Sequence, residues 1–270
     1  MVDIHLCQPD SKKSCAACCG IYNYAINDRD SLVSRFEYRT TLFSQVRKKL
    51  ISIDTYRDVI RHREESKRIY KTIYTCEFVG FLDDSHKRVG CMLHPLINNG
   101  EDLREISFYG RDICENHFCP SYQKLENHEA RIIIDCLDDW YIYGSVITDI
   151  DFVKTFFKII QARIGESVKP AVVESSDVLK GIINTYAYLK INWKFRDTDK
   201  PRFGKYYFVG EEYNIDRIDY EGLGAEPSIY DPIFLSLSSR FRNRSELDAA
   251  SRLLDGLIEG FCNEYSRNDR

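Results

Sequence analysis

Two helices are predicted after residue 30. In the first, apolar residues recur at intervals of three, four or seven and form one face: Leu32, Phe36, Phe43, Val46 and Leu50. Asp30 and Ser31 stand before that face and are candidate N-terminal caps. The second helix begins near Ser52 with a face of its own at 56–60, and its polar continuation "RHREESKR" fits a solvent-exposed surface.

The second half of the chain shows stronger helical periodicity. Ser245, with Asp248 three residues later, resembles a capping box and opens the last predicted helix. A strand is expected at 205–210, "KYYFVG", and irregular structure at 222–232. The predicted helices lie near 122–143, 149–164, 176–190 and 245–264.

Residues 73–119 keep no regular period and are interrupted by glycines and prolines. A stretch of this length without regular elements needs an internal organiser or a function, and a bound metal would supply the organiser. The expected fold is therefore mainly α, with an irregular cysteine-rich metal-binding lobe packed on a helical domain and little β structure. Residues 1–120 form the metal-binding region with about two helices, and residues 121–270 form the helical region, either as a second domain or continuous with the first.

Composition changes this picture little. The chain has 270 residues, of which 43% are hydrophobic and 30% charged, as in ordinary soluble globular proteins rather than disordered or fibrous ones. Its formal net charge of -4 gives no general attraction to nucleic acid, and the basic run at 47–49 fits exposed surface. Because no signal peptide and no membrane-length apolar segment is found, we expect a cytoplasmic protein that does not enter membranes.

Cysteine usage changes the picture more. Of ten cysteines, eight lie within the first 119 residues. The other two, Cys136 and Cys262, lie on helical apolar stripes and are predicted to be buried thiols. In a reducing compartment, cysteines serve as metal ligands, redox groups or small apolar side chains more often than as disulfides.

The eight N-terminal cysteines stand beside turn-forming residues, in "CAACCG", "VGCMLHP" and "ICENHFCP". Such turns can direct several thiolates to one point, so we predict metal ligands, although the alternative that these thiols only fill the core stays open. A structural zinc takes four ligands and an iron-sulfur cubane up to four thiolates, so eight cysteines suffice for two sites, or for one site with thiols to spare. The predicted ligands are Cys7, Cys15, Cys18, Cys19, Cys76, Cys91, Cys114 and Cys119.

Two positions are ambiguous, one in this set and one outside it. Cys19 is hard to place on the ion that Cys18 binds, because adjacent residues normally direct their side chains apart. It would serve a second metal, a second iron or the core. His94 follows Cys91 by three residues, a spacing compatible with one zinc ion, but an ordinary loop histidine beside Pro95 is the alternative.

"CAACCG", followed far downstream by "CEFVGFLDDSHKRVGCMLHP", resembles the YkgJ-like cysteine-cluster proteins, a family of zinc- or iron-chelating candidates with a CxxCxxCC element. The resemblance covers about the first 120 residues and implies ligands at Cys15, Cys18, Cys19, Cys76 and Cys91. It departs at position 12, where Lys12 replaces the leading cysteine and Cys7 is the candidate substitute. A fainter similarity to the flagellin lysine methylase FliB favours an iron-sulfur cluster over Zn²⁺.

Three functions remain open. The favoured one is a metal-cluster protein that holds an iron-sulfur cluster or zinc for redox, sensing or structural purposes. The second is an enzyme, a protein methyltransferase or an oxidoreductase with an accessory cluster, although the chain has no Walker loop, GxGxxG, HExxH or GxSxG motif. The third is a zinc-stabilised module that binds a protein partner. "CAACCG" is expected to form one half of the site and Cys76, Cys91, Cys114 and Cys119 the other.

Overall fold

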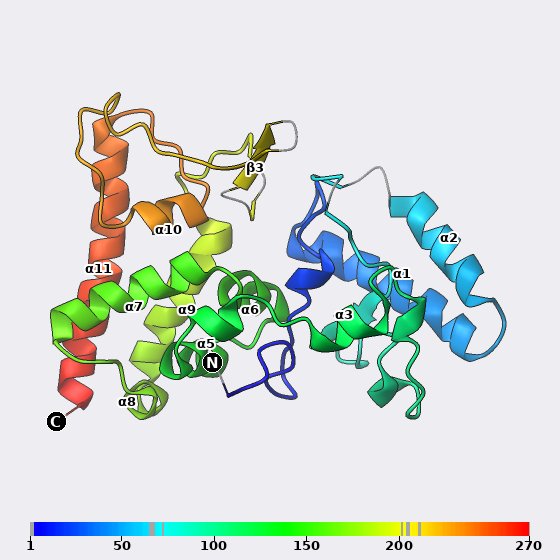
Figure 1. The fold of residues 1–270 in the computed structure, drawn as a ribbon. Helices are drawn as coiled ribbons and strands as arrows, with labels where there is room; N and C mark the ends of the chain where they lie inside the picture. Colours follow the sequence, from blue (N-terminus) through cyan, green and yellow to red (C-terminus); the bar gives the residue numbers. More distant parts are fainter. Residues whose placement is uncertain are drawn as a thin grey trace. The chain divides into compact units, whose positions relative to one another are not determined.

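The computed structural model describes residues 3–64, 68–71, 73–200, 202–203, 206–209 and 212–269. Helices predominate, and the described strands form two short antiparallel hairpins (Figure 1). The predicted mainly α fold with little β structure is therefore confirmed. The chain divides into two compact units. We call residues 5–120 with 139–144 the cysteine-bearing unit, and 121–138 with the chain from 145 onward the helical unit.

The cysteine-bearing unit contains two long helices, one hairpin and several short helical turns. The hairpin pairs Val79 with Cys91, Gly80 with Gly90 and Phe81 with Val89. Within the region predicted to be irregular, 73–119, the regular elements are therefore only three to seven residues long. In chain order the elements are η1 (Ala17–Cys19), α1 (Arg29–Arg47), α2 (Ile53–Glu64), β1 (Val79–Phe81), β2 (Val89–Cys91), η3 (Pro95–Ile97), η4 (Arg104–Ile106) and α3 (Gly110–Asn116).

The ends of α1 differ from the sequence prediction. Asp28, not Asp30 or Ser31, is the N-cap, because its carboxylate accepts a hydrogen bond from the Ser31 amide at 2.9 Å. The helix ends at Arg47, and Leu50 lies beyond it with 70% of its surface exposed. The apolar stripe therefore extends one turn beyond the helix it marks.

Aromatic side chains form the core of the cysteine-bearing unit. Phe36 of α1 contacts Phe81 of β1 and Trp140, with ring centroids 5.9 and 5.6 Å apart. Tyr56 of α2 stacks on Phe78 at 5.5 Å, and its hydroxyl donates to the Glu77 carbonyl at 2.7 Å. This core fixes the strand β1 and the residues just before it, which include Cys76.

The chain after residue 120 starts with a break between helices that the sequence did not reveal. The predicted helix over 122–143 is wrong: α5 stops at Cys136, and Leu137 has an extended backbone before the chain turns helical again at Trp140. The Asp139 carboxylate accepts hydrogen bonds from the amides of Tyr141 and Ile142 and so starts the new helix. The segment is divided into α4 (Ser121–Lys124), α5 (Asn127–Cys136) and α6 (Trp140–Ile147).

The other predicted helices of this half are present. The capping box at Ser245 is wrong, because Asn243 is the N-cap and accepts from the Glu246 amide at 3.0 Å. The strand at 205–210 is found over Tyr206–Val209, with Lys205 and Gly210 outside the described residues. The elements are α7 (Ile150–Ile164), α8 (Pro170–Ser175), α9 (Asp177–Asn192), β3 (Tyr206–Val209), β4 (Glu212–Ile215), α10 (Asp231–Ser236) and α11 (Arg244–Asn268).

The core of the helical unit lies between α7, α9, α10 and α11. Tyr186 of α9 stacks on Phe152 and Phe156 of α7, with ring centroids 4.2 and 4.1 Å apart. Lys190 is buried and satisfied, since its ammonium donates to the Asp149 carboxylate at 2.5 Å and to the Ser236 carbonyl at 3.0 Å. The unit thus has a complete core of its own.

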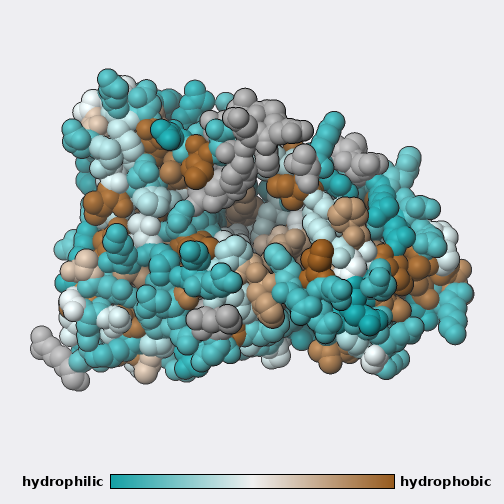
Figure 2. Space-filling view, viewed as in Figure 1, coloured by the Kyte–Doolittle hydropathy of each residue, from teal (hydrophilic) through white to brown (hydrophobic). Residues whose placement is uncertain are grey.

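The surface is mainly polar. On the face in Figure 2, hydrophilic residues cover most of the area and hydrophobic residues form small separate groups. Across the described part of the chain, no helix has the length and apolarity that crossing a membrane would require.

Candidate metal centre

The eight predicted ligands all lie in the cysteine-bearing unit. All ten cysteines of the chain are present as thiols. Cys15, Cys76 and Cys119 are buried, Cys18 is exposed, and the others are half-buried. Cys136 and Cys262 are also half-buried, so the prediction that these two are buried thiols is wrong.

The segment "CAACCG" folds as the 3-10 helix η1 followed by a left-handed glycine. Gly20 has a φ of 83° and closes the helix by donating its amide to the Ala17 carbonyl at 2.9 Å. Since a 3-10 helix has three residues per turn, neighbouring side chains point about 120° apart. Cys18 and Cys19 therefore face different directions, as the sequence suggested.

One set of thiols gathers around Cys15 and Cys18. The Cys15 amide donates to the Cys7 carbonyl at 2.9 Å, which fixes these two residues side by side. Burial raises the pKa of the Cys15 thiol, and the nearby thiols of Cys7 and Cys119 raise it further. The pKa of Cys18 is raised mainly by its hydrogen bond with Cys119. We call Cys7, Cys15, Cys18 and Cys119 the first thiol group.

A second set gathers around Cys19. The Cys76 amide donates to the Cys19 carbonyl at 2.9 Å, and the Val79 amide donates to the Cys76 carbonyl at 3.5 Å. Val79 in turn pairs with Cys91 across the β1–β2 hairpin. Burial raises the pKa of Cys19, and the three other thiols of this set raise it further. We call Cys19, Cys76, Cys91 and Cys114 the second thiol group.

The two groups are neighbours rather than isolated. The pKa of Cys18 is also raised by Cys19, and that of Cys19 by Cys7. Within each group the contacts include a backbone hydrogen bond. Between the groups the described contacts are electrostatic, apart from the peptide bond that joins Cys18 to Cys19. Cys18 of "CAACCG" thus neighbours the downstream Cys119, and Cys19 neighbours the downstream Cys76. That the two sets form the halves of one site stays a prediction.

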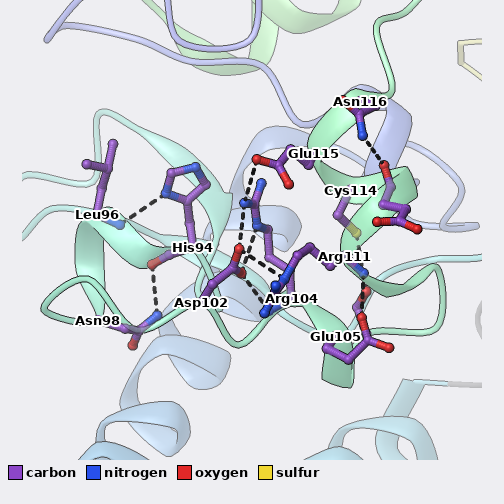
Figure 3. A network of polar contacts seen from close by, with 12 residues as sticks. His94, Leu96, Asn98, Asp102, Arg104, Glu105, Arg111, Cys114, Glu115 and Asn116 are labelled. Atoms are coloured by element: carbon purple, nitrogen blue, oxygen red, sulfur yellow. Dashed lines mark hydrogen bonds and ion pairs between the residues drawn. The ribbon is translucent and has the colours of Figure 1, made fainter.

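Charged residues surround one side of the second thiol group. Arg104 binds the Asp102 carboxylate through two hydrogen bonds of 2.7 and 2.9 Å, and Arg111 reaches the same carboxylate at 3.4 Å (Figure 3). The Ser107 hydroxyl lies 3.2 Å from the Cys114 sulfur. Burial and the Cys114 thiol raise the pKa of Cys91 to about 11, against the lowering effect of Arg104. Arg104 only partly offsets the effect of burial, and the net shift of the Cys91 pKa favours the protonated thiol.

An aromatic cluster covers the same group. Tyr74, Phe108 and Tyr109 pack together, with Tyr74 stacked on Phe108 at a centroid distance of 4.4 Å and meeting Tyr109 edge-on at 5.3 Å. Burial raises the pKa of Tyr109, and nearby thiols raise it further: Cys19, Cys76, Cys114 and Cys18. The phenol therefore lies among the thiols, while Phe108 is 65% exposed.

Arg39 supports the backbone of the second group from α1. Its guanidinium donates to the carbonyls of Cys76 and Val79, at 3.0 Å each, and binds the Glu64 carboxylate. Arg39 was not among the predicted functional residues, although it lies on the same helical face as Phe36 and Phe43, three and four residues away. A charged residue on an apolar face was the available signal.

His94 acts as an N-cap. Its Nδ1 accepts a hydrogen bond from the Leu96 amide at 3.2 Å, at the start of η3 (Figure 3). Burial and the nearby Arg104 lower the pKa of His94 and favour the neutral ring. This hydrogen bond gives His94 the structural role of an ordinary loop histidine beside Pro95.

The donor chemistry fits a soft metal or a cluster. Thiolates are the preferred ligands of zinc and of iron-sulfur clusters, and the arginines beside the second thiol group suit a centre of negative charge. Among the residues that the structure describes, no group of three or more His, Cys, Asp or Glu side chains has metal-binding geometry. The thiols are neighbours, and binding would require their side chains to turn toward a common point.

A cavity of about 510 Å³ occurs in the helical unit. Its walls are mainly charged, with Lys200, Arg217 and Arg240 beside Asp197 and Asp219. None of its lining residues is a cysteine. This cavity therefore does not border the cysteines, and it lends no support to an enzyme whose active site adjoins a cluster.

Comparison with known proteins identifies no relative: no family model, no curated protein and no solved structure matches the chain.

Proposed function

We propose that this protein is a metal-cluster protein that binds an iron-sulfur cluster or Zn²⁺ through its N-terminal cysteines. One observation supports the proposal: the eight thiols lie near one another in the cysteine-bearing unit. Up to 112 residues of chain, between Cys7 and Cys119, separate them in the sequence. Core filler would not require thiols to neighbour one another, because any small apolar side chain fills space equally well. The resemblance to the YkgJ-like family supports the same proposal.

The surroundings favour an iron-sulfur cluster over zinc as the first candidate. The cluster of Tyr74, Phe108 and Tyr109 and the buried Arg39 lie beside the second thiol group, and hydrogen bonds and charge near the sulfurs set the potential of such clusters. A thiolate centre of this kind would fit a reducing compartment such as the cytoplasm. Zn²⁺ remains the alternative, with a structural role.

Metal analysis of protein purified without oxygen tests the proposal. We expect iron with acid-labile sulfide, or else zinc, in the full chain, and no metal when the eight N-terminal cysteines are changed to serine. The matched control is the double variant Cys136→Ser with Cys262→Ser, which should keep its metal. A wild-type chain that is folded by circular dichroism yet contains neither metal would overturn the proposal.

A further inference from the structure

The two adjacent cysteines of "CAACCG", Cys18 and Cys19, contact different thiols. Cys18 forms its hydrogen bond with Cys119, whereas Cys19 is bound through its carbonyl to the Cys76 amide at 2.9 Å. One ion seldom takes both members of an adjacent pair, since the intervening backbone holds the two sulfurs apart. Cys18 and Cys19 therefore belong to two different groups of thiols.

Each side of this division collects three further thiols by backbone contacts and proximity. Beside Cys18 are Cys15, Cys119 and Cys7, the last fixed to Cys15 by a 2.9 Å backbone hydrogen bond. Beside Cys19 are three others, drawn from the segment that leads into β1, from the end of β2 and from α3: Cys76, Cys91 and Cys114.

Four is the number of ligands that a closed zinc site and a cubane both require. Resting on the proposed function, we propose that the chain holds two separate four-thiolate centres, one formed by the first thiol group and one by the second. Both centres would take the same class of ligand, a Zn²⁺ ion or an iron-sulfur cubane. "CAACCG" then contributes two ligands to the first centre and one to the second.

The two centres would differ in their surroundings. The first includes the exposed Cys18, whereas the second has no exposed thiol and lies beside Arg39, Arg104 and Tyr109. Within the first group, Cys15 lies against Gly144, with 3.5 Å between its sulfur and the place of a Cβ at that glycine. The alternative arrangement is one centre that shares all eight thiols, because Cys7 and Cys19 also influence each other.

Titration of the metal-free full chain with Co²⁺ tests the division. Co²⁺ enters tetrahedral thiolate sites and gives a visible absorption from the thiolate-metal bond, so both stoichiometry and ligand type are read from one experiment. Cys18→Ser removes one ligand of the first group at an exposed position, and Cys114→Ser removes one of the second at a half-buried position. The fold should tolerate either substitution, and circular dichroism of the two variants checks that they are folded.

The expected result is about two tight equivalents of Co²⁺ in the wild type and in the control Cys262→Ser. Each single variant should keep about one tight equivalent with half of the absorption, and the double variant Cys18→Ser with Cys114→Ser should keep none. One equivalent in the wild type, or loss of all tight binding in either single variant, would overturn the division while leaving the proposed function in place. No tight Co²⁺ binding by the wild type would overturn the division, and if protein purified without oxygen also contains neither zinc nor iron with acid-labile sulfide, the proposed function is overturned as well.

Discussion

Glu64 and Arg39 form the most deeply buried ion pair near the second thiol group. The Arg39 side chain is 1% exposed and the Glu64 side chain 6%, and the Tyr24 hydroxyl donates to the same carboxylate at 2.8 Å. Because the guanidinium also binds the carbonyls of Cys76 and Val79, it holds the chain just before β1. Breaking such a pair from one side costs more than its formation contributes, since a buried charge is left alone.

The lowered pKa of Glu64 predicts that the free energy of unfolding decreases in acid. Burial opposes ionisation of the Glu64 carboxyl, but Arg39 and Arg35 outweigh it, and the net pKa lies below the ordinary value of 4.5. The unfolded chain therefore takes up this proton first. The contribution to stability is complete above pH 4.5 and is lost as the pH falls through the lower pKa of the folded state.

We expect Glu64→Gln to lower the free energy of unfolding at pH 7 by about 3–5 kcal/mol. The same variant should show a shallower loss of stability below pH 4.5 than the wild type. Urea unfolding followed over pH 3 to 7 measures both effects, with the exposed Glu259→Gln on α11 as the control that changes neither by more than about 0.5 kcal/mol. Parallel pH profiles for Glu64→Gln and the wild type would show that the Glu64 carboxylate makes no pH-dependent contribution to the free energy of unfolding.

Among the elements, the long helices were predictable and the breaks between them were not. A stripe such as Phe152, Phe156 and Ile160 specifies α7 by spacing alone. The break at Leu137 depends on a carboxylate that caps the next helix, and the strands β1 and β2 are only three residues long, too short for a period-two pattern. The cap at Asn243 rather than Ser245 is equally a matter of one side chain's direction.

The turn after η1 predicts a local test of the cysteine segment. Gly20 and Gly165 both have a φ of 83°, but their surroundings differ. A Cβ on Gly20 would lie 2.5 Å from the Tyr74 carbonyl oxygen and 2.9 Å from the Thr75 Cα, whereas one on Gly165 would meet nothing within 4 Å. Any alanine at such a φ costs about 1–2 kcal/mol, and the collision adds about 1–3 kcal/mol at Gly20 only.

We therefore expect Gly20→Ala to destabilise the protein more than Gly165→Ala and to weaken Co²⁺ binding, because it displaces the backbone that carries Cys18 and Cys19. Gly165→Ala should bind Co²⁺ as the wild type does. Urea unfolding and Co²⁺ titration of the two variants measure this. Equal destabilisation, or undisturbed binding by Gly20→Ala, would mean that the close approach to Tyr74 and Thr75 is not needed for the thiol groups.

At the scale of the whole molecule, the sequence identified the candidate ligands but could not sort them. Residue type and neighbouring turn formers mark each cysteine locally. Which thiols meet depends on long-range closure: Cys119 reaches Cys18 from 101 residues away, and Cys76 reaches Cys19 from 57 residues away. Tyr109 and Arg104 were missed for the same reason, since nothing local marks them as neighbours of thiols.

The division into two units predicts where loss of the proposed metal will be felt. The helical unit has its own core around Tyr186, whereas residues 73–119 of the cysteine-bearing unit have few regular elements. A ligand that binds only the folded state stabilises the part that forms its site, and metal binding commonly completes the folding of such loops.

Hydrogen exchange of the full chain, with its metal and after chelation, measures this. Chelation should lower protection most at backbone amides that tie the thiol-bearing loops together, those of Cys15, Cys76 and Met92, whose acceptors are the carbonyls of Cys7, Cys19 and Phe78. Amides of α7, α9 and α11 should keep their protection, because aromatic packing rather than ligation stabilises them. Equal loss in both units would instead mean that they unfold as one cooperative structure, and unchanged protection at Cys15 and Cys76 would mean that no metal organises these loops.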